Sequence, residues 1–138
     1  MKIKLRIMVG ILLLASVMAV GMAVGCTPQG QAQGSYTDIS AAEAKQLVDE
    51  NPDVIIIDVS PYYESGHLPG AVSYYLGDGS LDAAIPMLDK NATYLVYCHG
   101  ESPSRQGAQK LVDAGFMNVY RLEGDYQAWV DAGYPIET

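Results

Sequence analysis

The chain has 138 residues, of which sixteen are acidic and eight are basic. This length allows one domain of ordinary size after a short leader and excludes two. Without residues 1–25, five basic residues remain against all sixteen acidic ones, a net charge of −11. Such a surface repels phosphate backbones and anionic lipid headgroups, which argues against a nucleic-acid partner and against electrostatic binding to a membrane.

Residues 1–25 differ in composition from the rest of the chain. A basic start is followed by 17 residues without charge, Val9 to Gly25, which end in the small residues Ala23-Val24-Gly25 before Cys26. This segment resembles the signal peptide of a bacterial lipoprotein. The resemblance predicts cleavage before Cys26 and lipidation of that cysteine, although Leu is usual where Ala23 stands. Two alternatives stay open: an uncleaved anchor helix, since the run is near the length of a membrane span, and a cleaved secretory peptide with a spare Cys26.

The lipoprotein interpretation is preferred, and it predicts a location outside the cytoplasmic membrane, with the lipid as the only membrane contact. Residues 26–35 would then comprise the lipidated Cys26 and a flexible linker, TPQGQAQGS, that has no charge and no large apolar residue. The globular domain is predicted over residues 36–138.

The first half of this domain begins with a helix and a strand. Ser40-Ala41-Ala42-Glu43 fits a capping box, which predicts a helix to about Glu50 with Leu47 and Val48 facing inward. The β-branched run 53–59 predicts a strand buried on both faces. A helical turn after Ser60-Pro61, a brief strand at 71–74 and a weak helix at 81–88 are predicted next.

The second half repeats the alternation of strand and helix. The expected elements are a strand at 93–98, a loop at 99–104, a helix at 105–114, a strand at 118–122 and a helix at 125–131. This order predicts an α/β domain of three layers with a mainly parallel sheet. Ligands bind at the carboxyl ends of strands in such folds, and Cys98 ends one of the central strands.

The segment after Cys98 suits sulfur chemistry. It consists of polar and small residues that lead into a helix: His99, Gly100, Glu101, Ser102, Pro103, Ser104 and Arg105. Converging backbone N–H groups and the positive end of the helix dipole are predicted to stabilise the thiolate and lower the pKa of Cys98. The alternative is that Cys98 is a small buried apolar residue.

Several segments spread over residues 36–138 form a recognisable pattern: Asp58-Val59, Gly66-His67-Leu68-Pro69-Gly70-Ala71, Tyr97-Cys98, Leu122-Glu123-Gly124, Trp129 and Gly133-Tyr134-Pro135. These segments give the domain a resemblance to a single-domain rhodanese. It implies a five-stranded parallel sheet flanked by helices, and transfer of sulfane sulfur through a Cys98 persulfide. A small sulfur donor or a protein persulfide would supply the sulfur and a thiol would accept it, with no cofactor and no metal.

The segment after Cys98 departs from the family pattern C-R-x-G-x-R. His99 stands where an Arg is common, Glu101 where Gly is usual, and Pro103 where the second Arg is usual. Ser60 also replaces an Arg, and Asp125 replaces a second Gly. Without these arginines an anionic sulfonate loses its charge-assisted donors, so a neutral or protein-borne persulfide is a better donor than thiosulfate. Arg105 lies in a helical turn from which it can point outward.

Three further residues have candidate roles near Cys98. His99 could stabilise the thiolate or move a proton, but a solvent-facing loop position is the preferred interpretation. His67 is interpreted as structural, in a turn beside the sheet. Asp58 is expected to bind backbone or loop donors at the end of its strand.

Other functions fit the sequence less well. A phosphatase of this fold needs C-x5-R, and Ser104 stands where the Arg should be. A thioredoxin-type enzyme needs C-x-x-C, which is missing. Cys98, His99 and His67 show no metal-ligand spacing. The main alternative is a catalytically silent rhodanese-like module that binds a partner protein.

Overall fold

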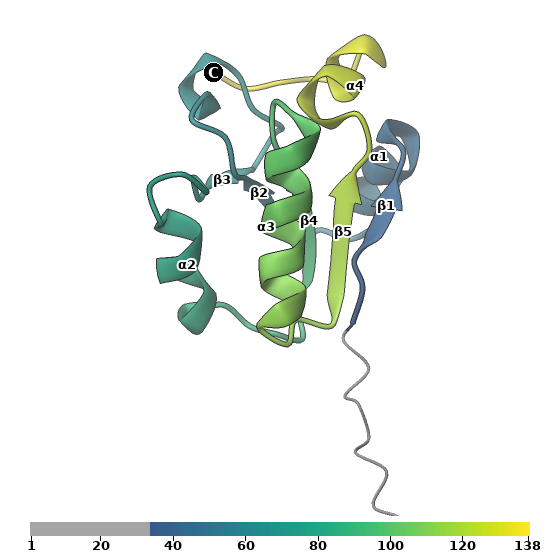
Figure 1. Cartoon of the computed structure of the whole chain (residues 1–138). Coiled ribbons are helices and arrows are strands. Elements are labelled where there is room, and N and C mark those ends of the chain that lie inside the picture. Colours follow the sequence, from purple (N-terminus) through teal and green to yellow (C-terminus); the bar gives the residue numbers. More distant parts are fainter. Residues whose placement is uncertain (1–33) are drawn as a thin grey trace, which may run out of the picture.

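The structure is a computed structural model that describes residues 34–138, and the predicted leader and Cys26 lie outside these residues. Five strands form one parallel sheet in the order β1-β5-β4-β2-β3 (Figure 1). The bounds of the strands are β1 Thr37–Ile39, β2 Ile55–Asp58, β3 Val72–Ser73, β4 Thr93–Tyr97 and β5 Asn118–Leu122. The three-layer α/β class and the parallel sheet predicted from the sequence are confirmed.

Helices cover both faces of this sheet (Figure 1). Their bounds are α1 Ala41–Glu50, α2 Ser80–Ala84, α3 Glu101–Asp113 and α4 Asp125–Asp131, with short 3₁₀ turns η1 at Tyr63–Ser65 and η2 at Ile85–Met87. No helix within residues 34–138 is long and apolar enough to cross a membrane.

Two apolar clusters, one on each face, hold the helices to the sheet. Alternate residues of β4 divide between them: Tyr94 and Val96 pack with α2 and α3, whereas Leu95 and Tyr97 pack with α1 and α4. Gly107 lets α3 approach the sheet closely, because a Cβ atom there would lie 3.1 Å from Val59. Burial of both faces explains the continuous β-branched sequence of β2.

Several elements match the sequence-based expectations and others correct them. Ser40 caps α1 through the predicted capping box, and β5 and α4 have the predicted bounds. The prediction of a loop at 99–104 is wrong, because α3 begins at Glu101. The helix predicted at 81–88 is a short α2 followed by η2, with Pro86 at the start of the 3₁₀ turn. Edge strand β1 was not predicted, since three residues carry too little pattern.

Candidate active site around Cys98

Cys98 directly follows β4, and the start of α4 holds its backbone on both sides. The Cys98 N–H donates to Asp125 Oδ1 at 3.0 Å, and the Cys98 carbonyl accepts the N–H of Tyr126 at 3.0 Å. The side chain is only 4% exposed and packs with Val59 and Ala108 in the cluster beneath α3. Its position is therefore fixed by three elements, β4, α3 and α4.

Backbone donors just before α3 act on the Cys98 thiol. The N–H groups of Gly100 and His99 lower its pKa, against the effect of burial. Gly100 is the N-cap residue in an extended conformation, and no side chain caps the helix there. The first N–H groups of a helix have no intrahelical partner, so this start is suited to an anionic sulfur.

The remaining residues predicted as an active-site loop form the first turns of α3. Pro103 takes the third helical position, where an N–H is not needed for the helix. Ser104 is buried and donates through Oγ to the Glu101 carbonyl at 2.9 Å. Arg105 lies 3.7 Å from Glu101 and both side chains are exposed, so Arg105 points outward. Ser102 is also exposed.

The pKa of Cys98 differs from the sequence-based prediction. Burial raises it above the ordinary thiol value, and the Asp125 and Asp58 carboxylates raise it further. The N–H groups of Gly100 and His99 act in the opposite direction but do not prevail. The predicted fall of the pKa is therefore wrong, because desolvation of the thiolate outweighs the backbone donors.

A buried charge network lies behind Cys98 and was not foreseen. Arg121 is fully buried on β5, donates to Asp38 at 2.6 Å and to Ser104 Oγ at 3.3 Å, and lies 3.9 Å from Asp125. The Arg121 guanidinium holds the pKa of Asp38 below its usual range, whereas burial raises the pKa of Asp125.

One feature of the sequence indicated a special role for Asp125, because it stands where the family usually has a second Gly. Its backbone φ is +56°, in the left-handed region that favours glycine. Asp tolerates this conformation better than most residues, and here its carboxylate binds the backbone of Cys98. Arg121 gave no comparable signal, because a strand arginine is usually exposed.

Asp58 and Ser60 form a buried turn at the end of β2. Asp58 is fully buried, and its Oδ1 accepts the Ser60 N–H at 2.8 Å, as expected for a backbone-binding role. Ser60 Oγ in turn accepts the N–H of Tyr62 at 3.1 Å. Asp58 Oδ2 has no hydrogen-bond partner within the described part of the chain.

His99 is enclosed by aromatic rings, and the prediction that it faces solvent is wrong. Its ring stacks on Tyr126 at a centroid distance of 4.1 Å and lies 5.5 Å from the exposed Tyr62. The side chain is 19% exposed, and Nε2 lies 3.9 Å from Asp58 Oδ2. His99 therefore belongs to the wall of the site.

His67 lies in the turn after η1. Its Nδ1 is 3.0 Å from the Tyr63 carbonyl, its ring stacks on Tyr63 at 3.8 Å, and Nε2 is 3.6 Å from Glu137. Its backbone also pairs with Glu137 in both directions. These contacts tie the C-terminus to the turn. In residues 34–138, no group of three or more His, Cys, Asp and Glu residues is placed to hold a metal ion.

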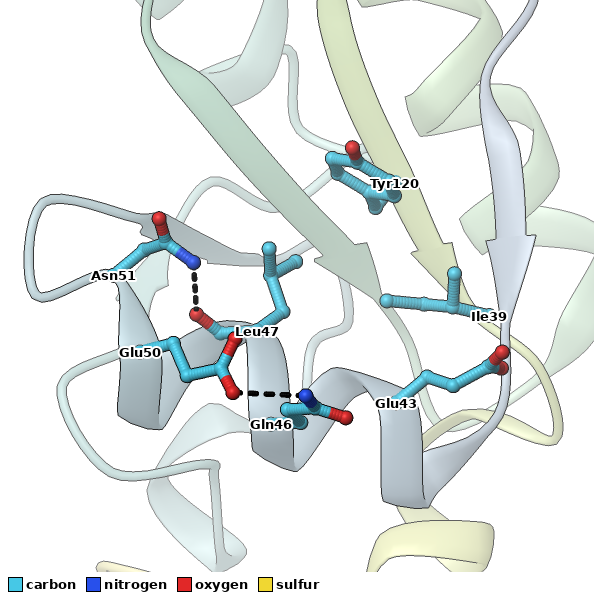
Figure 2. Close-up of a pocket in the computed structure, with 7 residues that line it drawn as sticks. All are labelled: Ile39, Glu43, Gln46, Leu47, Glu50, Asn51 and Tyr120. Carbon is cyan, nitrogen blue, oxygen red and sulfur yellow. Dashed lines mark hydrogen bonds between the residues drawn. The ribbon is translucent and has the colours of Figure 1, made fainter.

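A separate hollow lies on the other face of the sheet, between α1 and strands β1 and β5 (Figure 2). Its lining residues are Ile39, Glu43, Gln46, Leu47, Glu50, Asn51 and Tyr120. Gln46 donates to Glu50 and Asn51 donates to the Leu47 carbonyl, so these amides are already satisfied within α1. The hollow is lined by no cysteine, so it offers no thiol for the sulfur chemistry predicted for Cys98.

The match to a family model decides the family. The model of the rhodanese-like domain matches residues 40–132, which include all four helices and four of the five strands. The chain belongs to the rhodanese-like family. Several similar proteins are named thiosulfate sulfurtransferases.

A curated rhodanese-like relative is thiosulfate sulfurtransferase GlpE of Coxiella burnetii (strain RSA 331 / Henzerling II). It is 36% identical over 96 residues, which cover 68% of this chain and 87% of the relative. The rhodanese-like domain of the Anabaena sp. Alr3790 protein is 31% identical with a TM-score of 0.66, covering 72% of this chain and 77% of that one. Thiosulfate sulfurtransferase from Pseudomonas aeruginosa is 27% identical with a TM-score of 0.63, covering 74% of this chain and 20% of that one.

Proposed function

We propose that this rhodanese-like domain is a sulfurtransferase that carries sulfane sulfur as a persulfide on Cys98. The observation that carries the proposal is the position of Cys98 directly after the central strand β4 and just before α3, with its backbone held by Asp125 and Tyr126. Cys98 attacks the terminal sulfur of a donor R–S–SH, a bond to Cys98 Sγ forms, and the S–S bond of the donor breaks. The products are the Cys98 persulfide and R–SH, so no net oxidant is needed.

The proposed donor is an uncharged or protein-borne persulfide and not thiosulfate. Asp58 and Asp125 both raise the pKa of Cys98, which means that their negative charge reaches the sulfur. Pro103 offers no side-chain donor, and Arg105 is turned outward to Glu101. A sulfonate would therefore meet carboxylates without a guanidinium to bind it. The relatives named for thiosulfate support sulfur transfer and not the identity of the donor here.

The proposed location is outside the cytoplasmic membrane, with residues 1–25 as a cleaved leader and a lipid on Cys26. The support is the sequence Ala23-Val24-Gly25-Cys26 after an uncharged apolar run. Expression of the full chain in bacteria tests this. The parent chain should lose the leader and gain a lipid mass, and Cys26→Ala should do neither. An uncleaved parent chain without lipid would overturn the proposal.

Intact mass spectrometry tests the sulfur-carrier proposal. The full chain, beside Cys98→Ser, is measured before and after treatment with a small-molecule persulfide and, separately, with thiosulfate. The parent should gain one sulfur atom from the persulfide, and cyanide should remove that atom again. Cys98→Ser, which keeps Cys26, should not gain a sulfur atom at position 98. Thiosulfate should transfer sulfur much more slowly.

The alternative function is a silent module that binds a partner protein. The observation in its favour is the buried Cys98, whose raised pKa makes the thiolate scarce at neutral pH. A folded parent protein with a free Cys98 that takes sulfur from no donor would favour this module and contradict the sulfur carrier.

A further inference from the structure

The end of the molecule that holds the proposed nucleophile also carries a continuous surface of aromatic and apolar side chains. The Tyr62 ring lies 5.5 Å from the His99 ring, and His99 stacks on Tyr126. Tyr126 and Ile136 both border the same backbone position, because a Cβ atom on Gly66 would meet the Tyr126 hydroxyl and the Ile136 side chain. One surface, the aromatic rim, is therefore formed by four residues: Tyr62, His99, Tyr126 and Ile136.

The aromatic rim adjoins Cys98 and is open to solvent at two places. His99 follows Cys98 in the chain, and Tyr126 donates its N–H to the Cys98 carbonyl. The start of α3, helix α4 and the C-terminus lie together at this end of the sheet (Figure 1). Tyr62 is 56% exposed and Ile136 is 42% exposed. Exposed aromatic and apolar side chains that gather beside a reactive group are typical of a surface that contacts another protein.

Exposed carboxylates flank the aromatic rim. Glu64 lies in η1, two residues after Tyr62, and its side chain is exposed. Glu137 follows Ile136 and keeps 56% of its side chain exposed, although its Oε2 accepts a backbone N–H at 3.1 Å. Glu101 in the first turn of α3 is 59% exposed. Three carboxylates from three segments of the chain therefore border this surface.

The cations of this end of the molecule are already engaged by other carboxylates. Arg105 lies 3.7 Å from Glu101. Arg121 is fully buried, where it donates to Asp38 at 2.6 Å and lies 3.9 Å from Asp125. The net charge around the aromatic rim is therefore negative. The other three cations of residues 34–138 lie in α1, in the loop before β4 and in the last turn of α3: Lys45, Lys90 and Lys110.

We propose that the aromatic rim and its carboxylates bind a basic protein segment that brings a persulfide to Cys98. The inference rests on the proposed use of Cys98 as a sulfur carrier. Lysine or arginine side chains of the partner would pair with Glu64 and Glu137, and apolar side chains between them would cover Tyr62 and Ile136. The terminal sulfur of the partner's persulfide passes to Cys98, and the partner leaves as the thiol.

A protein segment fits this surface better than a small cationic molecule. The exposed side chains come from the turn after β2, the first turn of α3 and the C-terminus, so one small molecule would contact only part of them. Opposite charge across such a surface mainly raises the association rate, and salt screens the effect. The rate of sulfur transfer should therefore depend on the charge of the partner and on the ionic strength.

Two synthetic persulfide peptides test the preference for positive charge. They have the same length and a central cysteine persulfide, which is flanked by lysines in one peptide and by as many glutamates in the other. Sulfur gain on Cys98 of the full chain in detergent is followed by peptide mass. The lysine peptide should transfer sulfur about tenfold faster at low salt, and the ratio should fall to about two at about 0.5 M NaCl. Equal rates at low salt would overturn the docking surface.

Paired removals of charge locate the effect on the molecule. Glu64→Gln with Glu137→Gln keeps the side-chain carbonyl oxygens and removes two charges beside the aromatic rim. Glu50→Gln with Asp53→Asn removes two exposed charges at the end of α1 and before β2. The first pair should slow the lysine peptide several-fold and speed the glutamate peptide, whereas the second pair should change neither rate. Equal effects of the two pairs would mean that net charge alone decides the rate, which would contradict a docking surface.

Binding without sulfur transfer separates this inference from the sulfur-carrier proposal. A labelled lysine peptide with serine in place of its cysteine is titrated with the parent chain and the variants, and its fluorescence anisotropy is measured. The parent should bind it at low salt, Glu64→Gln with Glu137→Gln should bind it several-fold more weakly, and Ile136→Ser should weaken binding by a factor that salt does not change. No binding to the folded parent would overturn the docking surface. Binding without any sulfur uptake would support the docking surface and overturn the sulfur carrier.

Discussion

The two longer helices start in opposite ways. At α1, Ser40 Oγ accepts the Glu43 N–H, and Glu43 accepts the Ser40 N–H at 2.8 Å, so side chains of the helix itself satisfy its first donors. At α3, Gly100 provides no side-chain cap, and the backbone N–H groups of His99 and Gly100 lower the pKa of Cys98. The α1 start contributes to stability, whereas the α3 start leaves its donors free for chemistry.

The largest effect on the start of α3 is expected from a change of Arg121, because this start depends on the buried charges behind it. Arg121→Met leaves Asp125 and Asp38 without their cation. We expect a loss of about 3–5 kcal/mol in the free energy of unfolding, measured by urea denaturation. Arg105→Met, which removes an exposed cation from the same region, should cost less than about 0.5 kcal/mol. Equal costs would contradict a structural role for the network.

Charge at Asp125 offers a sharper test of the electrostatics at the sulfur. Asp125→Asn keeps an acceptor for the Cys98 N–H and tolerates the left-handed backbone, but it removes the negative charge. The pKa of Cys98 should fall, and alkylation at pH 7 should become several-fold faster, up to about tenfold. Asp131→Asn makes the same charge change at the exposed end of α4 and should leave the rate unchanged. A slower reaction in Asp125→Asn would show that the carboxylate assists the thiolate.

The cap of α1 should matter for stability alone. Ser40→Ala removes the side-chain acceptor of the capping box, and we expect a loss of about 1 kcal/mol in the free energy of unfolding. Sulfur uptake by the folded protein should stay at the parent rate, since the Ser40 side chain bonds Glu43 within the same helix and not the segment around Cys98. A slower uptake would mean that the two helix starts are coupled.

The smallest stability effect is expected where α3 is given a side-chain cap. Gly100→Ser fits the extended backbone, and a Cβ atom would meet only Pro103 at 3.9 Å. The new hydroxyl should stabilise the domain by a few tenths of a kcal/mol. An N-cap hydroxyl accepts from the second or third N–H of the helix, whereas the backbone donors that act on Cys98 belong to His99 and Gly100, so sulfur uptake should stay near the parent rate. Gly34→Ser, where the backbone is not left-handed and a Cβ atom would meet only Val112 at 3.7 Å, is the control for adding a hydroxyl elsewhere.

The sequence predicted those parts of the fold that depend on local pattern. The capping box located α1, and the β-branched run located β2, because both signals lie within a few residues. The start of α3 was misplaced because Gly100 and Pro103 indicate a loop in isolation, although Pro is compatible with the first helical turn.

The composition of the site was less predictable than the position of its nucleophile. Cys98 followed from its place at the end of a strand. Arg121, Asp125 and Tyr126 did not, since they are placed by tertiary contacts. Asp125 and Tyr126 bond the Cys98 backbone from α4, and Arg121 on β5 lies 3.9 Å from Asp125. The direction of the shift in the Cys98 pKa was missed for the same reason. Burial is a property of the packed fold, and its effect on the pKa outweighs that of two backbone donors.

The most direct test of the account is a crystal structure of the protein after treatment with a small-molecule persulfide. The account predicts an extra sulfur atom bonded to Cys98 Sγ and within hydrogen-bond distance of the N–H groups at the start of α3. An unmodified Cys98 in protein that has been exposed to the donor, with α3 and α4 in place, would contradict the assignment of Cys98 as a sulfur carrier.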